Sequence, residues 1–166
     1  LTWQYVDWYL RPTSAYYGAK KACEPIHVLF AYDDESIWVV NSYRKNFSNL
    51  RVTAEAFNLN NETLWSQTQE NVSVDKDGKT KIFKIDIPEE QRKPMFFLHL
   101  QLFDEANKLI SRNTYWLSAS PDIPGVSGHN IQGIFYTKPK SKADFTKLND
   151  LEKTQVRISG KEVSKT

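Results

Sequence analysis

The chain has 166 residues, of which 40% are hydrophobic and 25% are charged, so it is long enough for one globular domain with attached segments. The 22 Lys and Arg residues nearly balance the 20 Asp and Glu residues, and the basic residues gather only in segment 138–142. A nucleic-acid partner needs a concentrated basic patch and is therefore not expected. No apolar run approaches the roughly 18 residues of a membrane span, so a membrane partner is not expected either.

The first 24 residues predict two short helices. The apolar residues of segment 3–10 recur at helical spacing. Pro12 should end that helix, because proline lacks an amide donor and clashes with the preceding turn. A second helix should then run to about Cys23, with Thr13 or Ser14 as its cap.

Aromatic residues surround the first predicted helix on nearly every side. A helix that is apolar all round belongs between two masses of protein. We therefore expect this segment to pack against a neighbouring domain, and to be exposed or covered by a partner when the chain is alone. The residues expected at this interdomain contact are Trp3, Tyr5, Trp8, Tyr9 and Tyr16.

Residues 25–118 alternate with period two in seven segments separated by turn residues, which is the pattern of an all-β sandwich. In the third segment, for example, the apolar residues from Leu50 to Ala56 share one face. The expected fold is an immunoglobulin-like sandwich of seven antiparallel strands, with a short N-terminal helical segment and an irregular C-terminal extension. Cys23 is the single cysteine, so no intrachain disulfide is expected. The expected strands are 26–32, 37–41, 50–57, 67–74, 81–87, 96–103 and 109–117.

The remaining segment, 119–166, is rich in Pro, Gly, Ser and Lys, a composition typical of a linker. Within it, residues 143–151 predict a short helix, and residues 154–163 alternate like the opening strand of another domain. The expected domains are therefore 1–24, 25–118 and 119–166. The apolar first segment and the late strand suggest a piece of a longer protein.

The sequence YLRPTSAYYGAKKACEPIHVLFAYDDESIWVVN, at 9–41, resembles a junction in glycoside hydrolase family 2. In the exo-β-D-glucosaminidase and β-mannosidase branch of that family, the catalytic barrel there passes into an immunoglobulin-like domain. SRNTYWLSASPD, at 111–122, resembles the last strand of this domain. ADFTKLNDL, at 143–151, resembles the approach to a final sandwich domain, whereas segment 126–133 carries no such signature.

The resemblance implies a parent enzyme that hydrolyses β-linked glucosamine or mannose residues with retention, using two glutamates of the barrel. Those glutamates would precede residue 1, so the resemblance places no catalytic residue in this chain, which is expected to be inactive alone. The expected partners are the catalytic barrel and neighbouring domains of the parent chain, together with β-linked oligosaccharide. Polymeric substrates favour a secreted or periplasmic location.

Two acidic groups invite a functional interpretation, but neither predicts a site. Asp33, Asp34 and Glu35 lie at a connection between two expected strands, and their spacing matches no compact calcium loop. Asn61 and Glu62 repeat the Asn–Glu order of the family's acid/base residue, yet they lie in a polar turn with no barrel strand before it. A solvated connection and an ordinary turn are the favoured interpretations.

The histidines and glycines also predict no site. His27, His99 and His129 have no short paired spacing of the kind that metal ligands show. The six glycines are too scattered for a phosphate-binding loop, and no serine lies in a nucleophile-elbow pattern. Catalytic, cofactor-binding and metal-binding residues are therefore all expected to be absent.

The tryptophans of the sandwich separate two hypotheses of function. Trp38 and Trp116 lie within alternating strands and are expected in the core. Trp65 follows a polar turn, so it is the candidate for sugar contact if the chain is instead a carbohydrate-binding module. A third class, an adhesion sandwich, has no reason to carry the junction sequence. Three sites match the N-glycosylation pattern, which matters only in a eukaryotic source: Asn46, Asn61 and Asn71.

Overall fold

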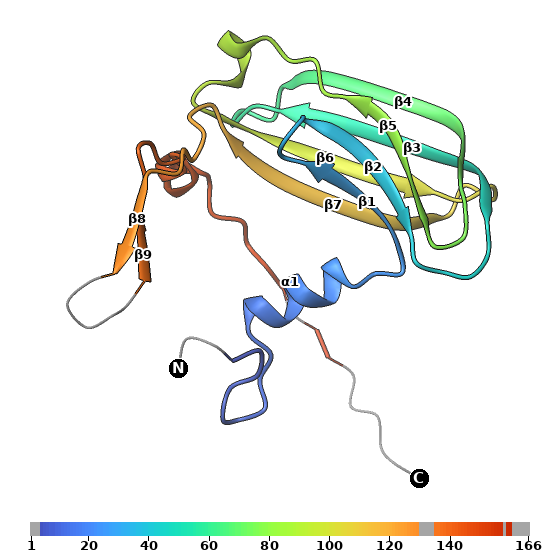
Figure 1. Cartoon of the computed structure of the whole chain (residues 1–166), viewed down its shortest axis with the longest axis horizontal. Coiled ribbons are helices and arrows are strands. Elements are labelled where there is room, and N and C mark those ends of the chain that lie inside the picture. Colours follow the sequence, from blue (N-terminus) through green and yellow to red (C-terminus); the bar gives the residue numbers. More distant parts are fainter. Residues whose placement is uncertain (1–3, 130–134, 158, 161–166) are drawn as a thin grey trace. The chain divides into compact units, whose positions relative to one another are not determined.

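The computed structural model describes residues 4–129, 135–157, 159 and 160 (Figure 1). Contacts divide the chain into two compact units, Leu1–Ala119 and Ser120–Thr166. The first unit holds a β-sandwich preceded by one helix, and the second holds a small hairpin and a short 3-10 helix.

Two antiparallel sheets form the sandwich. One has the strand order β1-β2-β5 and the other has the order β4-β3-β6-β7. The strands are β1 (Ile26–Ala31), β2 (Ser36–Asn41), β3 (Phe47–Phe57), β4 (Thr63–Val74), β5 (Gly78–Lys84), β6 (Met95–Phe103) and β7 (Leu109–Ser118). All seven predicted strands are confirmed, although β3 and β4 begin earlier than expected and β5 ends earlier.

The inward faces of both sheets make one hydrophobic core. Leu50, Val52, Ala54 and Ala56 of β3 are almost completely buried, as their alternation predicts. Beyond the end of β5 the same alternation continues, and Ile85 still packs into the core. Burial of these apolar side chains is the main force that holds the two sheets together.

Asn41 shows how a polar residue is accommodated in this core. Its side chain is buried, and its amide nitrogen donates to the carbonyl oxygens of Lys45 and Asp75, each at 2.8 Å. Its side-chain oxygen accepts the amide of Tyr43 at 2.9 Å. Each buried side-chain nitrogen or oxygen in the described part of the chain likewise has a partner, as native cores require.

The segment before the sandwich has one helix instead of the two that were predicted. Helix α1 (Ser14–Ala22) confirms the second prediction. The helix predicted over 3–10 is wrong for the described residues, which form a turn closed by a bridge between Val6 and Pro12. Leu10, with φ of 60°, lies in the left-handed region that interrupts a helix. Thr13 precedes α1, but its hydroxyl makes no cap bond to the helix.

The second unit departs most from the sequence-based expectation. It contains an antiparallel hairpin of β8 (Val126–His129) and β9 (Phe135–Lys138), which was not predicted. The helix expected over 143–151 is present only as a 3-10 turn, η2 (Thr146–Asp150). The strand expected over 154–163 is absent from the part of it that the structure describes, 154–157 with 159 and 160.

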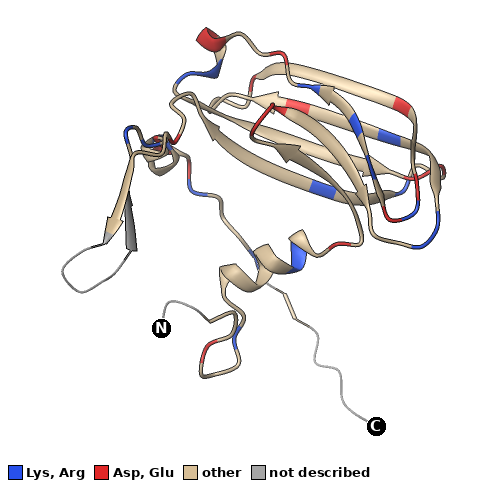
Figure 2. Cartoon of the chain, viewed as in Figure 1, with Lys and Arg blue, Asp and Glu red and all other residues tan. Residues whose placement is uncertain are grey.

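Two further features complete the described chain. A short 3-10 helix, η1 (Glu89–Arg92), connects β5 to β6. Among the described residues, the helices are all too short and too polar to cross a lipid bilayer. Figure 2 shows Lys and Arg in both sheets, whereas Asp and Glu lie in the four-stranded sheet and in the connections between strands. The charged residues of the three-stranded sheet are the lysines of β5, Lys79, Lys81 and Lys84.

Candidate functional site

A closed loop presents the aromatic residues that precede α1. The carboxylate of Asp7 accepts hydrogen bonds from the amides of Tyr9 and Arg11, both at 2.9 Å, and from Nε of Arg11 at 2.8 Å. At the base of the loop, the amide and hydroxyl of Thr13 donate to the carbonyl oxygen of Tyr5 at 2.9 and 3.1 Å. These bonds replace the predicted helix, because Asp side chains readily bond to nearby backbone amides.

The tip of this loop is strongly exposed. Trp8 is 87% exposed, Leu10 is 84% exposed and Tyr9 is 75% exposed. Tyr5 and Tyr16 are also exposed, whereas Trp3 lies outside the described residues. Apolar side chains gathered in one exposed loop commonly mark an interaction site. The exposure agrees with the expectation for the isolated chain, while docking itself stays a prediction.

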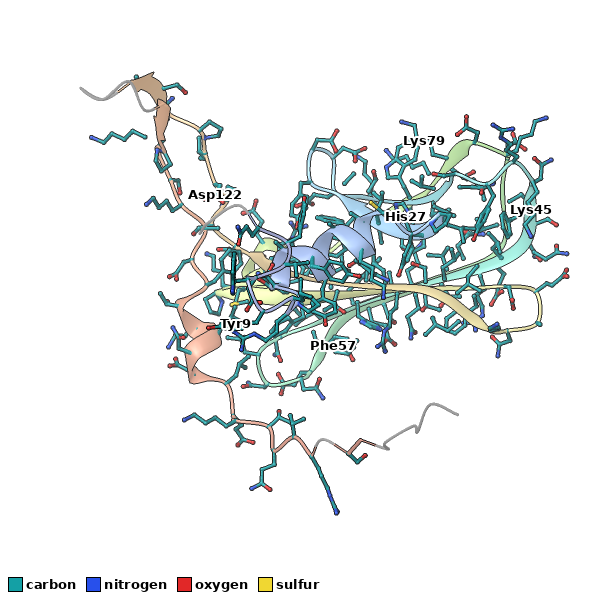
Figure 3. The ribbon with its side chains drawn as sticks, turned by 90° about the horizontal axis from the view of Figure 1, so that it is seen from below. Tyr9, His27, Lys45, Phe57, Lys79 and Asp122 are labelled. Carbon is teal, nitrogen blue, oxygen red and sulfur yellow. The ribbon has the colours of Figure 1, made fainter. Side chains whose placement is uncertain are left out.

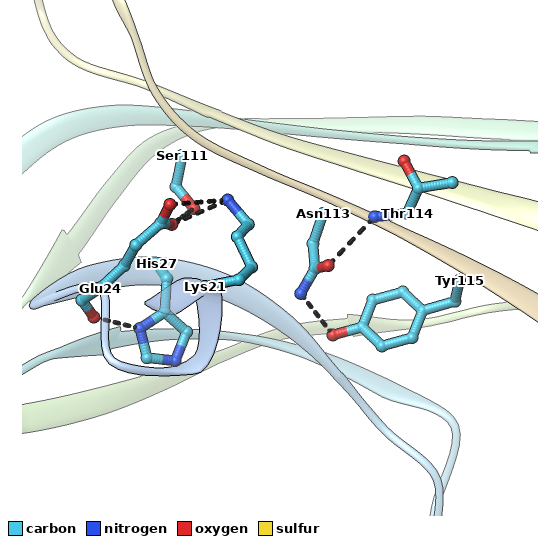
Figure 4. Close-up of polar contacts among 7 residues, drawn as sticks. All are labelled: Lys21, Glu24, His27, Ser111, Asn113, Thr114 and Tyr115. Atoms are coloured by element: carbon cyan, nitrogen blue, oxygen red, sulfur yellow. Dashed lines mark hydrogen bonds and ion pairs between the residues drawn. The ribbon is translucent and has the colours of Figure 1, made fainter. Parts of the chain in front are cut away.

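Helix α1 is tied to the sandwich through polar contacts. Nζ of Lys21 lies 2.8 Å from Oε2 of Glu24, and the hydroxyl of Ser111 donates to the same oxygen at 3.1 Å (Figure 4). Nδ1 of His27 lies 2.7 Å from the carbonyl oxygen of Glu24. An open groove of about 600 Å³ separates α1 from strands β6 and β7, with Arg112 among its lining residues. Its polar lining suits hydrogen bonding more than apolar packing.

Trp65, the candidate for sugar contact, is not an exposed ring at the end of a strand. It lies within β4 opposite Ala56, is half-buried, and packs against the core. Its ring meets that of Phe83 edge to face, with centroids 5.9 Å apart. The half-buried ring offers less surface for stacking on a sugar, and sugar contact at this residue stays a prediction.

Trp38 and Trp116 are not in the core, which corrects the prediction for both. Trp38 is half-buried on the outer face of the three-stranded sheet, where its Nε1 donates to the hydroxyl of Ser36 at 2.7 Å. The ammonium groups of Lys79 and Lys81 lie 5.2 and 5.7 Å from its ring centroid. Trp116 is 55% exposed on β7. Figure 3 shows that Lys79 and strand β3 belong to opposite outer sides of the sandwich.

Two of the three carboxylates in the connection between β1 and β2 form ion pairs. Oδ2 of Asp34 lies 2.5 Å from Nζ of Lys81, and hydrogen bonds from Lys81 and then Ser36 lower the pKa of Asp34 to about 2. Glu35 forms an ion pair with Arg92 at 2.7 Å. The described residues contain no group of three His, Cys, Asp or Glu side chains arranged to hold a metal ion.

Asn61 and Glu62 lie in a surface turn, as expected. The side-chain oxygen of Asn58 accepts the amides of Asn60 and Glu62 at 2.9 and 3.0 Å. The amide nitrogen of Asn58 donates to Oε2 of Glu62 at 2.6 Å. The Glu62 carboxylate therefore stabilises the turn that it belongs to.

The histidines have local partners where the structure describes them. Nδ1 of His99 lies 2.9 Å from the hydroxyl of Thr114 on the outer face of the four-stranded sheet. The side chain of His129 lies outside the described residues. Arg112 and Thr114 lie on the same period-two face of β7 as Trp116, so the sequence carries a signal that this tryptophan points outward.

Comparisons with known proteins match the chain to carbohydrate-active enzymes. The exo-β-D-glucosaminidase of Amycolatopsis orientalis is 33% identical over 165 residues, which are 99% of this chain and 16% of that enzyme. The exo-β-D-glucosaminidase of Hypocrea jecorina is 28% identical over 162 residues, 96% of this chain and 17% of that one. A mannosylglycoprotein endo-β-mannosidase of Lilium longiflorum is 29% identical over 116 residues, 69% of this chain and 12% of the enzyme.

The same relationship is present in three dimensions. The crystal structure of the Amycolatopsis orientalis exo-chitosanase matches 90% of this chain and 17% of that chain, with a TM-score of 0.76 and 34% identity. The chain therefore spans about a sixth of the length of these bacterial relatives. The model of the Mannosidase Ig/CBM-like domain family matches residues 34–120. The chain belongs to this family of immunoglobulin-like domains, and the expected relationship to the exo-β-D-glucosaminidase and β-mannosidase branch of glycoside hydrolase family 2 is confirmed.

Proposed function

We propose that the chain is a non-catalytic accessory domain of a larger glycoside hydrolase that acts on β-linked glucosamine or mannose residues. The exo-β-D-glucosaminidases are similar over nearly the whole chain, yet the chain corresponds to only 16–17% of their length. Two carboxylates lie in the acidic groups that could suggest catalysis. Asp34 forms an ion pair with Lys81, and Glu62 stabilises a surface turn. Catalysis with retention needs two free carboxyl groups across the bond, and we assign that pair to another part of the parent.

The observation that carries the accessory role is the exposed loop tip of Trp8, Tyr9 and Leu10. The Asp7 carboxylate ties the backbone of the loop through the amides of Tyr9 and Arg11, which lowers the backbone entropy that the loop loses on contact. We assign its contact to the catalytic domain of the parent chain. Aromatic side chains are enriched at the centre of such interfaces. Because the relatives act on carbohydrates, we also place the parent outside the cytoplasm.

Activity of the isolated chain tests the non-catalytic role. Purified chain is incubated with chitosan and with aryl β-glucosaminides and β-mannosides, and product release is followed after repeated purification. We expect release indistinguishable from buffer. Reproducible turnover that copurifies with the chain would refute the proposal.

Thermal unfolding tests the docking surface. Trp8→Ala should lower the melting temperature of the parent enzyme while leaving that of the isolated chain unchanged, because the side chain is 87% exposed in the latter. Tyr32→Ala is the contrasting control, because its ring contacts Phe30 and Tyr115 within the sandwich, and it should lower the melting temperatures of the parent and of the isolated chain alike. An equal effect of Trp8→Ala on the parent and on the isolated chain would place this contact elsewhere.

A further inference from the structure

A row of aromatic side chains crosses the outer face of the four-stranded sheet. Phe57 of β3 lies opposite Phe97 of β6, which lies opposite Trp116 of β7. Their neighbours along the strands, such as Ala56 and Leu98, are fully buried, so the three rings stand on the outer side. Adjacent strands are about 4.8 Å apart, and the row therefore spans about 10 Å. This is comparable with the length of a disaccharide.

The next row on the same face is polar. Glu55 of β3 lies opposite His99 of β6, which lies opposite Thr114 of β7. Glu55 is exposed, and within the described part of the chain its carboxylate has neither an ion pair nor a hydrogen bond. By contrast, Arg51 on the same strand and face pairs with Glu70 at 3.7 Å. An aromatic row thus lies directly beside a row that offers one unpaired carboxylate.

We propose that this face binds a β-linked oligosaccharide that carries free amino groups. The apolar face of a sugar ring stacks on aromatic side chains, and Trp116, which is 55% exposed, together with the half-buried Phe57 and Phe97 provides such a surface. An ammonium group is attracted both to a carboxylate and to the face of a Trp ring. Glu55 and Trp116 supply these two groups at opposite ends of the site. The choice of an amino sugar rests on the proposed parent substrate, while the binding activity goes beyond the accessory role.

The polar row favours a sugar over a neighbouring domain as the occupant. The centre of a protein interface is depleted of charged residues, because an unpaired charge there loses its hydration. Glu55 would become such a charge beneath an apolar partner, but it remains solvated beside a hydrated sugar. Arg112 lies beyond Thr114 on β7, so the ammonium group is oriented toward the Glu55 end.

Titration of the full chain with a β-1,4-linked glucosamine trimer, followed by NMR, tests the site. A β-1,4-linked glucose trimer is the matched neutral ligand. Trp116→Ala should weaken binding of both trimers about tenfold or more, because it removes the stacking surface. Glu55→Gln should weaken only the glucosamine trimer, about two- to fivefold, as expected for one exposed ion pair. Trp38→Ala, on the outer face of the three-stranded sheet, should bind as the unaltered chain does.

Trp116→Tyr keeps an aromatic ring and should retain most of the affinity. It distinguishes loss of the stacking surface from misfolding of the alanine variant. The proposal is overturned if the unaltered chain binds neither trimer at a trimer concentration of about 10 mM. Binding with a free energy of only a few kcal/mol is detectable at that concentration. The proposal is also overturned if Trp116→Ala binds as tightly as the unaltered chain. In both cases the face would be assigned to a neighbouring domain. The accessory role would not be affected, because it is tested separately by the turnover assay and by the thermal unfolding of Trp8→Ala.

Discussion

The hydroxyl of Tyr115 accepts a hydrogen bond from the backbone amide of Phe30 at 3.2 Å, which joins the edge strand of one sheet to the edge strand of the other. The side-chain amide of Asn113 donates to the same hydroxyl at 2.8 Å (Figure 4). Burial raises the pKa of Tyr115, so the phenol stays protonated at neutral pH. Because β1 is an edge strand, the Phe30 amide has no neighbouring strand as its acceptor on that side. The Tyr115 hydroxyl accepts its hydrogen bond instead.

Tyr115→Phe tests this contact with little change in shape. The ring should keep its packing on Phe30, whose centroid is 5.7 Å away, while the Phe30 amide loses its acceptor. We expect the free energy of unfolding in urea to fall by about 1–2 kcal/mol. Tyr43→Phe, at an exposed tyrosine, is the control and should change stability by less than about 0.5 kcal/mol. Equal stability of the two variants would mean that water replaces the hydroxyl without loss.

Leu100→Ala tests the assignment of the core. Leu100 is completely buried in β6, and its truncation should lower the free energy of unfolding by about 2–5 kcal/mol, because a cavity remains. Gln101→Ala, at the next residue on the outer face, is the matched control with an expected change within about 0.5 kcal/mol. Urea denaturation of both variants gives the comparison. Similar losses at the two positions would show that the inward and outward faces are wrongly assigned.

Asp34 should make stability depend on pH in the acid range. Hydrogen bonds from Lys81 and then Ser36 lower its pKa from 3.8 to about 2 in the folded chain. The ionised carboxylate therefore stabilises the fold above about pH 4, and this contribution is lost as the pH falls toward about 2. In urea unfolding, Asp34→Asn should be less stable than the unaltered chain near neutral pH and approach it at low pH.

Asp33→Asn is the control for Asp34→Asn, because it removes the adjacent carboxylate, which forms no ion pair within the described residues. Its stability should run parallel to that of the unaltered chain across the acid range. A constant difference between Asp34→Asn and the unaltered chain from neutral to acid pH would contradict the role given to the Lys81 contact.

The seven strands could be predicted because one face of each is buried. The apolar–polar alternation from Leu50 to Ala56 follows from the two-residue period of a strand that has one buried face and one solvent-exposed face. The outward direction of Trp116 could have been predicted from the polar residues that share its face of the strand. Trp38 was predicted wrongly because it lies in a run where apolar residues occupy both faces. There the pairing with neighbouring strands decides which face is inward, and that pairing is not a local property.

The N-terminal loop and the C-terminal hairpin were missed for different reasons. The Asp7 carboxylate accepts hydrogen bonds from the amides of Tyr9 and Arg11. These local bonds compete with the backbone bonds of a helix, and the helical spacing of apolar residues does not reveal them. The hairpin of β8 and β9 lies in a segment whose composition is typical of linkers, and short strands there have little alternation to detect. The exposure of Tyr5, Trp8 and Tyr9 agrees with the expectation for this segment although the helix expected to carry them is absent, and their docking stays a prediction.

Asp7→Ala tests whether one carboxylate holds the candidate docking loop in shape. The variant removes the acceptor of the Tyr9 and Arg11 amides, so both amides should exchange hydrogen with solvent about tenfold faster or more, while amides of β6 keep their protection. Asp7→Asn keeps one amide oxygen as an acceptor and should preserve much of the protection at Tyr9. Exchange measured by NMR on the isolated chain separates these outcomes. Unchanged exchange at Tyr9 in Asp7→Ala would mean that the base of the loop, where Thr13 bonds to Tyr5, suffices to order its tip.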